Sequence, residues 1–252
     1  MNRPRLLLVP EFTELTWTIK PELARWAEVA SYDLPGVGSE PLPHGDPHRL
    51  TREIIVDRGL QEADKRGWDR FFVLADGWAI PVAVRIARER PSSVLGMALG
   101  HASLSFSKQG ERPAMNPAVY DAMTQLLRQD HEAFIRYGIA QSTAGSVSEE
   151  LAQQMLDRFP RELILVGWER VTADDEPFGD ALRTLDLPLL LAKHDGCLMS
   201  TPEGFEDAAR ALPGARTVSV PRAPSTCEDF ATAVREFCQE VSRRAQRAPE
   251  PR

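Results

Sequence analysis

The 252-residue sequence predicts an α/β protein with a mostly parallel sheet of about six strands and helices on both faces. Two observations carry this prediction. Short apolar runs alternate with segments of helical periodicity, which is the pattern of a covered parallel sheet. One long stretch, residues 116–176, contains helical patterns only, which predicts an inserted helical cap. A chain of this length suffices for one large domain, and no linker-like stretch divides it.

The first half of the chain contains four predicted strands and the helices between them. The strands are "RLLLVPEF", "VASYDLPGVG", "DRFFVLAD" and "SVLGMALG". The helices are "KPELARWAEV", "LTREIIVDRGLQEADKRG" and residues 78–90. Because ligands bind outside the carboxyl ends of parallel strands, the residues that follow each strand are the best candidates for a site.

The helical segment comes next, and the alternation then resumes. "NPAVYDAMTQLLRQDHEAFIRYG" predicts a helix that begins after Asn116 and stops at Gly138. Ser146 followed by Glu149 predicts the capping box of a second helix. "RELILVGWERVTADD" fits a strand or a helix, and we favour a helix. "LDLPLLLAKHD" and "ARTVSV" predict two more strands, each followed by a helix. The predicted parts are an α/β core at 1–115 and 177–243, a cap at 116–176 and a flexible tail at 244–252.

Composition and charge exclude several classes of protein. The net charge is −7 and the basic residues are dispersed, which argues against a nucleic-acid partner. Apolar runs are too short to cross a bilayer and no signal peptide is recognisable, so we expect a cytoplasmic protein without a membrane partner. His44 and His48 lie in a proline-rich loop, a weak metal pattern. We expect no metal, no cofactor, a small-molecule or peptide substrate, and a monomer or homodimer.

The three cysteines form neither an even set nor a CxxC pair, which argues against a disulfide scaffold or a zinc site. Each is interpreted as a buried or idle thiol. They are Cys197, Cys227 and Cys238.

The order of these segments resembles the α/β-hydrolase fold over nearly the whole chain. "LLLVPEF" resembles the strand that ends in that family's oxyanion turn, and "YDLPGVGSEP" is similar to its Asp-x-Pro-Gly-x-Gly-x-Ser segment. "VLADGWAIPVAVRIARERP" resembles the nucleophile elbow and its helix. "LPLLLAKHDGCLMSTPEGFEDAARALPGARTVSVP" resembles the stretch that carries the catalytic acid and the last strand.

The resemblance also shows what this chain lacks. The elbow pattern falls on "ADGWA", so the nucleophile position holds Gly77, which has no side chain to attack a substrate. The family's histidine follows the last strand, but the last histidine here is His194. Glu11 stands in the oxyanion turn, where a carboxylate would repel a developing oxyanion. The chain is therefore identified as an atypical member that lacks the serine nucleophile and the triad histidine.

A nucleophile shifted to Asp76 is disfavoured, because that register places Leu74 and Trp78 where the turn needs small residues. Ser103, Ser105 and Ser225 have neither the spacing nor the turn type of a replacement nucleophile.

The candidate catalytic residues follow predicted strands. Carboxylates grouped under an apolar cap can have raised pKa values, which suits proton transfer. His101 directly follows a strand and is the best general acid or base at neutral pH. Each of these residues could instead have a purely structural role. A carboxylate could accept backbone hydrogen bonds, and the histidine could bind a loop carbonyl. The catalytic candidates are His101, Glu11, Asp76 and Asp195, and the substrate-binding candidates are Phe12, Trp17, Gly77, Trp78 and His194.

Three functions remain open from the sequence. We favour an enzyme of proton-transfer chemistry, an isomerase, epimerase or cyclase acting on a small or peptidic substrate in biosynthesis. His101, Glu11 and Asp76 would serve as acid–base or orienting groups. The alternatives are a non-catalytic pseudoenzyme that binds a hydrophobic ligand, and an ester or amide hydrolase with a displaced nucleophile.

Overall fold

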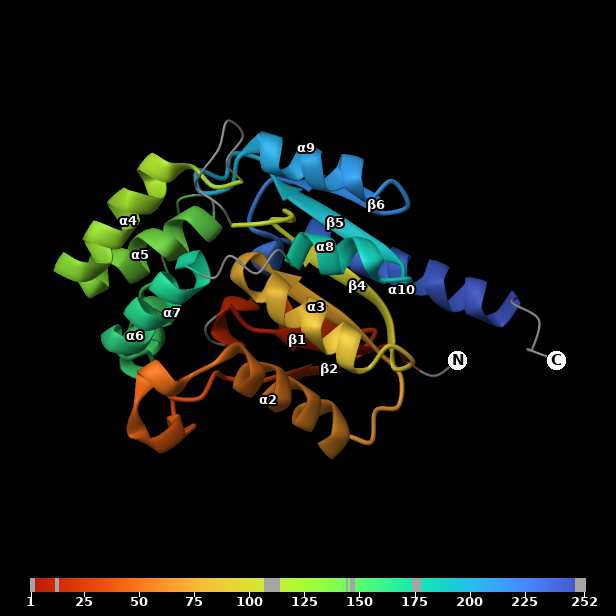
Figure 1. Ribbon diagram of the computed structural model, residues 1–252, viewed down its shortest axis with the longest axis horizontal. Helices are drawn as coiled ribbons and strands as arrows, with labels where there is room; N and C mark the ends of the chain where they lie inside the picture. The colour runs from red at the N-terminus through yellow and green to blue at the C-terminus, as the bar shows by residue number, and fades with distance from the viewer. Residues whose placement is uncertain are drawn as a thin grey trace.

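A six-stranded sheet runs through the centre of the molecule, and each neighbouring pair of strands is parallel (Figure 1). The strand order is β2-β1-β3-β4-β5-β6. The predicted α/β class is thereby confirmed. The computed structural model describes residues 3–11, 14–106, 114–143, 145, 148–173 and 178–247. The strands are β1 Arg5–Val9, β2 Glu28–Ser31, β3 Phe71–Asp76, β4 Val94–Gly100, β5 Leu189–His194 and β6 Arg216–Val220.

Helices cover both faces of this sheet because the side chains of its central strands are apolar on both sides. In β3, Phe72 and Leu74 point to one core layer, and Val73 and Ala75 point to the other. The first layer is closed by α1 and α10, and the second by α2, α3 and α8 (Figure 1). The bounds of these helices are α1 Lys20–Ala24, α2 Arg52–Lys65, α3 Ile80–Glu89, α8 Phe178–Thr184 and α10 Glu228–Arg247, and α9 Pro202–Ala211 links β5 to β6.

Four helices between β4 and β5 lie together beside the sheet (Figure 1). An aromatic cluster centred on Trp168 packs three of these helices against one another. Its indole stacks on Tyr120, with ring centroids 5.0 Å apart, and meets Phe134 edge-on at 5.4 Å. The rings of Trp168 and Trp78, the residue after Gly77, also pack together, with their centroids 5.2 Å apart. The helices are α4 Pro117–Gln129, α5 His131–Ser142, α6 Glu149–Arg158 and α7 Arg161–Ala173.

Several predicted boundaries differ from the structure for local reasons. The helix predicted to run from Asn116 to Gly138 is broken at Asp130, whose carboxylate accepts a hydrogen bond from the backbone N–H of Ala133 at 2.9 Å and so starts α5. Helix α5 then passes through Gly138 without ending.

The start of α6 also differs. Ser148 caps α6, while Ser146 lies outside the described residues.

Three other segments can be compared with their predictions. The ambiguous segment "RELILVGWERVTADD" forms a helix, as favoured, over its described part. Helix α8 is absent from the predicted elements. The tail predicted from residue 244 continues as helix α10 to Arg247, so its predicted beginning is wrong.

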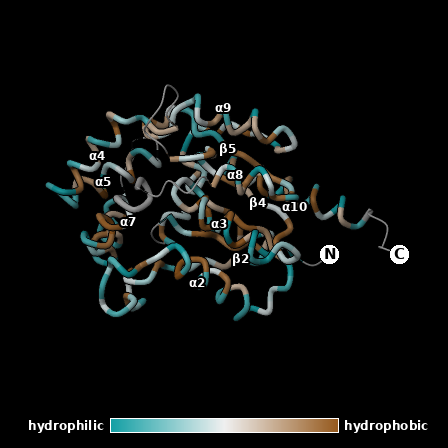
Figure 2. Tube along the Cα trace, viewed as in Figure 1, coloured by the Kyte–Doolittle hydropathy of each residue, from teal (hydrophilic) through white to brown (hydrophobic). Residues whose placement is uncertain are grey.

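Apolar residues gather in the strands and on the inner sides of the helices, and hydrophilic residues lie on the outer surface (Figure 2). None of the helices in the described part of the chain has the length and apolar character needed to span a bilayer.

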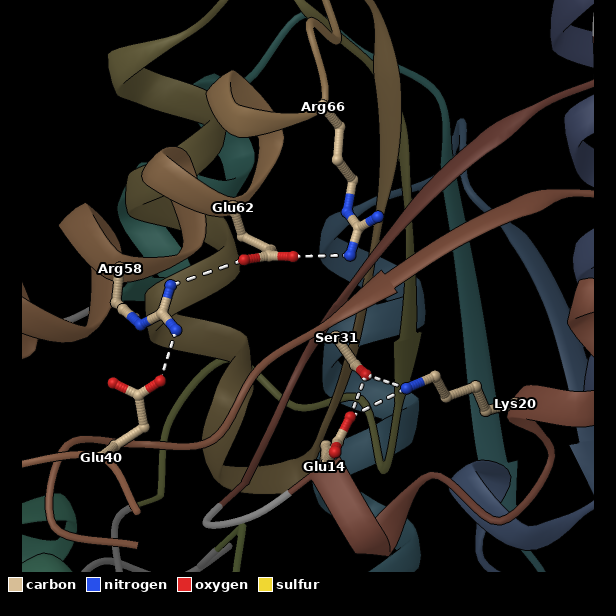
Figure 3. Close-up of polar contacts among 7 residues, drawn as sticks. All are labelled: Glu14, Lys20, Ser31, Glu40, Arg58, Glu62 and Arg66. Carbon is tan, nitrogen blue, oxygen red and sulfur yellow. Dashed lines mark hydrogen bonds and ion pairs between the residues drawn. The ribbon is translucent and has the colours of Figure 1, made fainter. Parts of the chain in front are cut away.

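Two polar networks lie around the β2 side of the sheet (Figure 3). In the first, Lys20 contacts Glu14 at 2.8 Å and Ser31 at 2.5 Å. In the second, Arg58 reaches Glu40 at 2.7 Å and Glu62 at 3.5 Å, and Glu62 also accepts from Arg66 at 2.7 Å. The side chains of Arg58 and Glu62 are only 17% and 13% exposed, so the centre of this network is shielded from water, whereas Glu40 and Arg66 lie at its more exposed ends.

Replacing Arg58 with alanine should lower the free energy of unfolding by about 1–2 kcal/mol, because Glu40 and Glu62 lose a shielded partner. The matched variant is Arg90→Ala, which breaks a more exposed pair with Asp64 and should change stability by no more than about 0.5 kcal/mol. Denaturant unfolding of both variants measures the difference, and equal losses would contradict this role of Arg58.

Candidate active site

The carboxyl ends of the strands bring together residues that are distant in the sequence. Glu11 follows β1, Asp76 ends β3, His101 follows β4 and His194 ends β5. The short helical turn Pro224–Thr226, which follows β6, reaches the same edge. Because all these strands are parallel, their carboxyl ends share one edge of the sheet, and the predicted candidates meet there.

The elbow after β3 has the geometry of a tight strand-to-helix turn. Gly77 has φ +47°, a left-handed conformation that side chains disfavour. A Cβ atom built at Gly77 would overlap Oε1 of Glu11. The same oxygen accepts a hydrogen bond from the backbone N–H of Trp78 at 3.3 Å. The glycine therefore makes room for the Glu11 carboxyl.

Asp76 is the buried anchor of the site and is only 1% exposed. Its Oδ1 accepts from Nδ1 of His101 at 2.6 Å, and its Oδ2 accepts from the backbone N–H of Ser225 at 3.0 Å. Burial alone would raise the pKa of Asp76, but the charge and hydrogen bonds of His101 and Ser225 outweigh burial and lower it. Asp76 is therefore a carboxylate at neutral pH.

His101 is held in an uncommon backbone conformation, with φ +45°. Its Nδ1 is committed to Asp76, and its Nε2 lies 3.1 Å from Nδ1 of His194. Burial lowers the pKa of His101, but the Asp76 carboxylate raises it well above the ordinary value. The two residues form a carboxylate–imidazolium pair whose Nε2 side faces His194 and Cys197.

Cys197 is the functional candidate that sequence reasoning missed. Its Sγ lies within 4.8 Å of ring nitrogens of both His101 and His194, and it accepts a hydrogen bond from the backbone N–H of Ser200 at 3.4 Å. Burial raises the pKa of the thiol, but the two histidines outweigh it and lower the pKa to about 5. The one signal in the sequence is its position close behind His194 in "KHDGC".

Two histidines and a cysteine at this site offer atoms of the kind that bind metal ions. Among the described residues, the ring nitrogens of His101 and His194 and the Cys197 sulfur lie within 4.8 Å of one another. Imidazole and thiolate are ligands that zinc accepts. The direct 3.1 Å contact between the two rings also pairs these nitrogens without a metal.

Glu11 differs from Asp76 in its protonation. Burial and the nearby Asp76 carboxylate raise the pKa of Glu11 to about 8, against the opposing effects of His101 and the Trp78 N–H. At neutral pH Glu11 is mostly a neutral carboxylic acid that can donate a hydrogen bond. Two buried carboxyl groups in one site thus hold opposite protonation states, a division typical of acid–base chemistry.

A pocket of about 220 Å³ connects these groups to the helices α4–α7. Its polar end contains Glu11, His101, His194 and Cys197. Its walls are mainly apolar, and on the elbow side the rings of Trp78 and Phe106 pack together with their centroids 4.9 Å apart. The apolar side chains from α4–α7 include Val119, Met123, Ile135, Met155 and Ile164.

Two of the predicted site residues that the structure describes are not brought into this cluster, and a third predicted residue cannot be placed. Asp195 is exposed, and its carboxylate accepts from the hydroxyl of Ser219 at 2.7 Å, because the turn after β5 directs it toward β6. Trp17 is buried in the core, where its indole N–H donates to the carbonyl of Val9 at 3.1 Å. Phe12 lies outside the described residues.

Comparison with solved structures identifies the fold. No protein-family model matches the chain, and no curated protein matches it in sequence. Solved structures match it over nearly its whole length. A bromoperoxidase from Bacillus anthracis has a TM-score of 0.77 at 13% identity, covering 95% of this chain and 92% of that one. An esterase from Exiguobacterium antarcticum has a TM-score of 0.75 at 14% identity, covering 94% and 92%.

A loop variant of a haloalkane dehalogenase from Bradyrhizobium elkanii is also similar, with a TM-score of 0.72 at 18% identity over 97% of this chain and 91% of that one. With the parallel sheet and its strand order, these likenesses show that the chain has the α/β-hydrolase fold.

The raised pKa of Glu11 should appear in the pH dependence of stability. Between its ordinary value of 4.5 and about 8, the folded protein keeps a proton on Glu11 that the unfolded chain has lost. Glu11 therefore makes the free energy of unfolding fall as pH rises through this window. The Glu11→Gln variant lacks this titration, so its stability relative to the wild type should increase from pH 5 to pH 8, by at most about 1.4 kcal/mol per pH unit.

Denaturant unfolding of both proteins at several pH values tests this expectation. Taking the difference between them removes the titrations of Asp76, His101 and Cys197, which both proteins retain. A difference that does not vary with pH would contradict the raised pKa.

The fit between Gly77 and Glu11 predicts coupled substitutions. Gly77→Ala should destabilise the protein by more than the roughly 1–2 kcal/mol of a left-handed backbone, because its methyl group would meet the Glu11 carboxyl. In a Glu11→Ala background only the backbone cost remains. A double-mutant cycle measures the coupling, expected at about 1 kcal/mol or more. Additive effects would show that Glu11 does not fill this space.

Proposed function

We propose that this protein is an enzyme of proton-transfer chemistry that isomerises, epimerises or cyclises a small apolar or peptidic substrate in a biosynthetic pathway. The observation that carries the proposal is the Asp76–His101 pair, joined at 2.6 Å at the polar end of an apolar pocket. The nucleophile position of the elbow, Gly77, has no side chain for the hydrolytic reaction of the fold.

The pair supplies a proton at a defined atom. Asp76 accepts from Nδ1 of His101 and so keeps the exchangeable proton of the imidazolium on Nε2. From there it can pass to a substrate oxygen, and the neutral ring can later accept a proton at the same atom. His194, 3.1 Å from Nε2, is placed to relay protons between the ring and the pocket.

Neutral Glu11 supports the same chemistry from the elbow. Once His101 has given its proton to the carbonyl oxygen, the neutral ring takes the proton next to the carbonyl group, and the C–H electron pair forms the C=C bond of an enol. The protonated Glu11 carboxyl, also on the pocket wall, is a second donor to the same oxygen. Asp76 cannot serve as such a donor, because it is ionised and its two oxygens are engaged by His101 and Ser225.

Deuterium exchange into a panel of carbonyl compounds tests the proposal. The protein is incubated in D₂O with apolar ketones, esters and N-acyl peptides, and deuterium incorporation next to the carbonyl group is measured by mass spectrometry. Wild-type protein should exchange at least one compound, and His101→Asn should reduce the rate by about 100-fold or more, since the proton donor is lost.

The matched control is His48→Asn, which changes an exposed histidine outside the pocket and should leave exchange unchanged. Circular dichroism establishes that both variants remain folded. Stoichiometric ligand binding without exchange would contradict the proposal and support the ligand-binding alternative.

A further inference from the structure

We propose that Cys197 is a nucleophile that takes the acyl group of an apolar ester or thioester, with His101 as its acid–base partner and Asp76 as the positioning residue. This inference goes beyond the proton-transfer function, because it adds a covalent step at a residue outside the elbow. Either can fail alone, since they are tested with different compounds and different readouts.

The arrangement around Cys197 is that of an activated thiol. Asp76 fixes Nδ1 of His101 at 2.6 Å, so the other ring nitrogen is directed toward the group containing His194 and Cys197. The Cys197 sulfur lies within 4.8 Å of a ring nitrogen of His101, and the Ser200 N–H donates a hydrogen bond to the sulfur at 3.4 Å. Cys197, His101 and Asp76 thus lie next to one another in space as a nucleophile, a base and a third group that orients the base.

The other two cysteines lack these surroundings. Cys227 and Cys238 are 1% and 0% exposed and lie in the apolar core, Cys227 directly before α10 and Cys238 within it. Burial raises the pKa of Cys238, whereas the histidines lower that of Cys197 to about 5. A thiolate is the reactive form of cysteine, so at neutral pH only Cys197 combines ionisation by histidine with access to a pocket.

The covalent step balances within the site. The Cys197 thiolate attacks the carbonyl carbon of the ester, an S–C bond forms, and the π electron pair moves to oxygen. When the intermediate collapses, the bond to the alcohol breaks and the leaving oxygen takes the proton from Nε2 of His101. Water then attacks the thioester as neutral His101 accepts its proton, the C–S bond breaks, and the thiolate–imidazolium pair is restored.

Glu11 removes the electrostatic objection to this chemistry. A carboxylate on the wall of the pocket would repel the oxyanion of the tetrahedral intermediate. Burial and Asp76 raise the pKa of Glu11 to about 8, so at neutral pH the group is a donor and can stabilise the oxyanion.

The chemistry of the pocket indicates an apolar acyl group. Met123, Ile135 and Met155 line its wall, and the flexible methionines can adapt to an aliphatic chain. Leu198, next to Cys197, also lines the pocket. It is 50% exposed, whereas the other large hydrophobic residues in the described part of the chain are more buried. An acyl chain on Cys197 would cover it.

Alkylation by iodoacetamide first tests the thiol itself. In native wild-type protein at pH 7, labelling should occur at Cys197, which lines the pocket beside two histidines. In His101→Asn the labelling of Cys197 should slow by about tenfold or more, because the neighbouring base is lost. Equal labelling rates in the two proteins, or labelling confined to Cys227 or Cys238, would overturn the proposal.

The acyl step is then tested with p-nitrophenyl octanoate and p-nitrophenyl acetate. Wild-type protein should release p-nitrophenol in a burst and gain one octanoyl group, located on Cys197 by peptide mass spectrometry. The acetate should react at least about tenfold more slowly, as it makes fewer apolar contacts. Cys197→Ala should lose the burst and the adduct, while Cys227→Ala, a matched change at a buried cysteine, should keep both.

Two kinds of outcome would overturn the proposal. One is a reaction at another residue, seen as an octanoyl adduct elsewhere or as an equal burst in Cys197→Ala with its fold retained by circular dichroism. The other is labelling of Cys197 by iodoacetamide only after incubation with EDTA, because a thiolate bound to a metal ion is a ligand and not a free nucleophile.

Discussion

The hydrogen bond between the Asp76 carboxylate and Nδ1 of His101 is the interaction on which the rest of the site depends. It joins the ends of two neighbouring central strands inside the protein, where an unpaired carboxylate would be strongly destabilising. The surrounding chain is built to permit it. A Cβ atom at Gly100 would overlap Asp76 and Pro224, so glycine is the residue that fits there. The Ser225 N–H donates a hydrogen bond to the second carboxylate oxygen of Asp76. The left-handed backbone of His101 completes this arrangement.

The elbow illustrates how a fold can keep its backbone geometry while its chemistry changes. Gly77 retains a positive φ and the tight turn into α3, yet the space above it is occupied by Glu11 from the end of β1. The space that a side chain at this position would take is therefore filled by a carboxyl group of the protein itself. The Trp78 N–H, which points where an oxyanion donor would be expected, is bound to Glu11. Besides Glu11 itself, the polar groups that face the pocket lie farther along the sheet, at the ends of β4 and β5.

The sequence predicted the fold and the meeting of Glu11, Asp76, His101 and His194, because apolar runs locate parallel strands and parallel strands end at a common edge. It could not predict side-chain direction within a turn. One such turn carries both Asp195, which faces Ser219 at the β6 edge, and Cys197, which faces the histidines. Only the path of the backbone after β5 distinguishes them. The split at Asp130 was likewise hidden, because the apolar periodicity of α4 and α5 is continuous across it.

The opposite protonation of Glu11 and Asp76 has an electrostatic consequence for what the pocket admits and releases. At neutral pH the His101 imidazolium balances the Asp76 carboxylate, Glu11 is neutral, and the Cys197 thiolate leaves these groups with net negative charge. In a partly buried, mainly apolar enclosure such charge is weakly screened. Neutral molecules can enter without repulsion, whereas an anionic ligand would be repelled. The charge balance of the site thus favours neutral over anionic ligands.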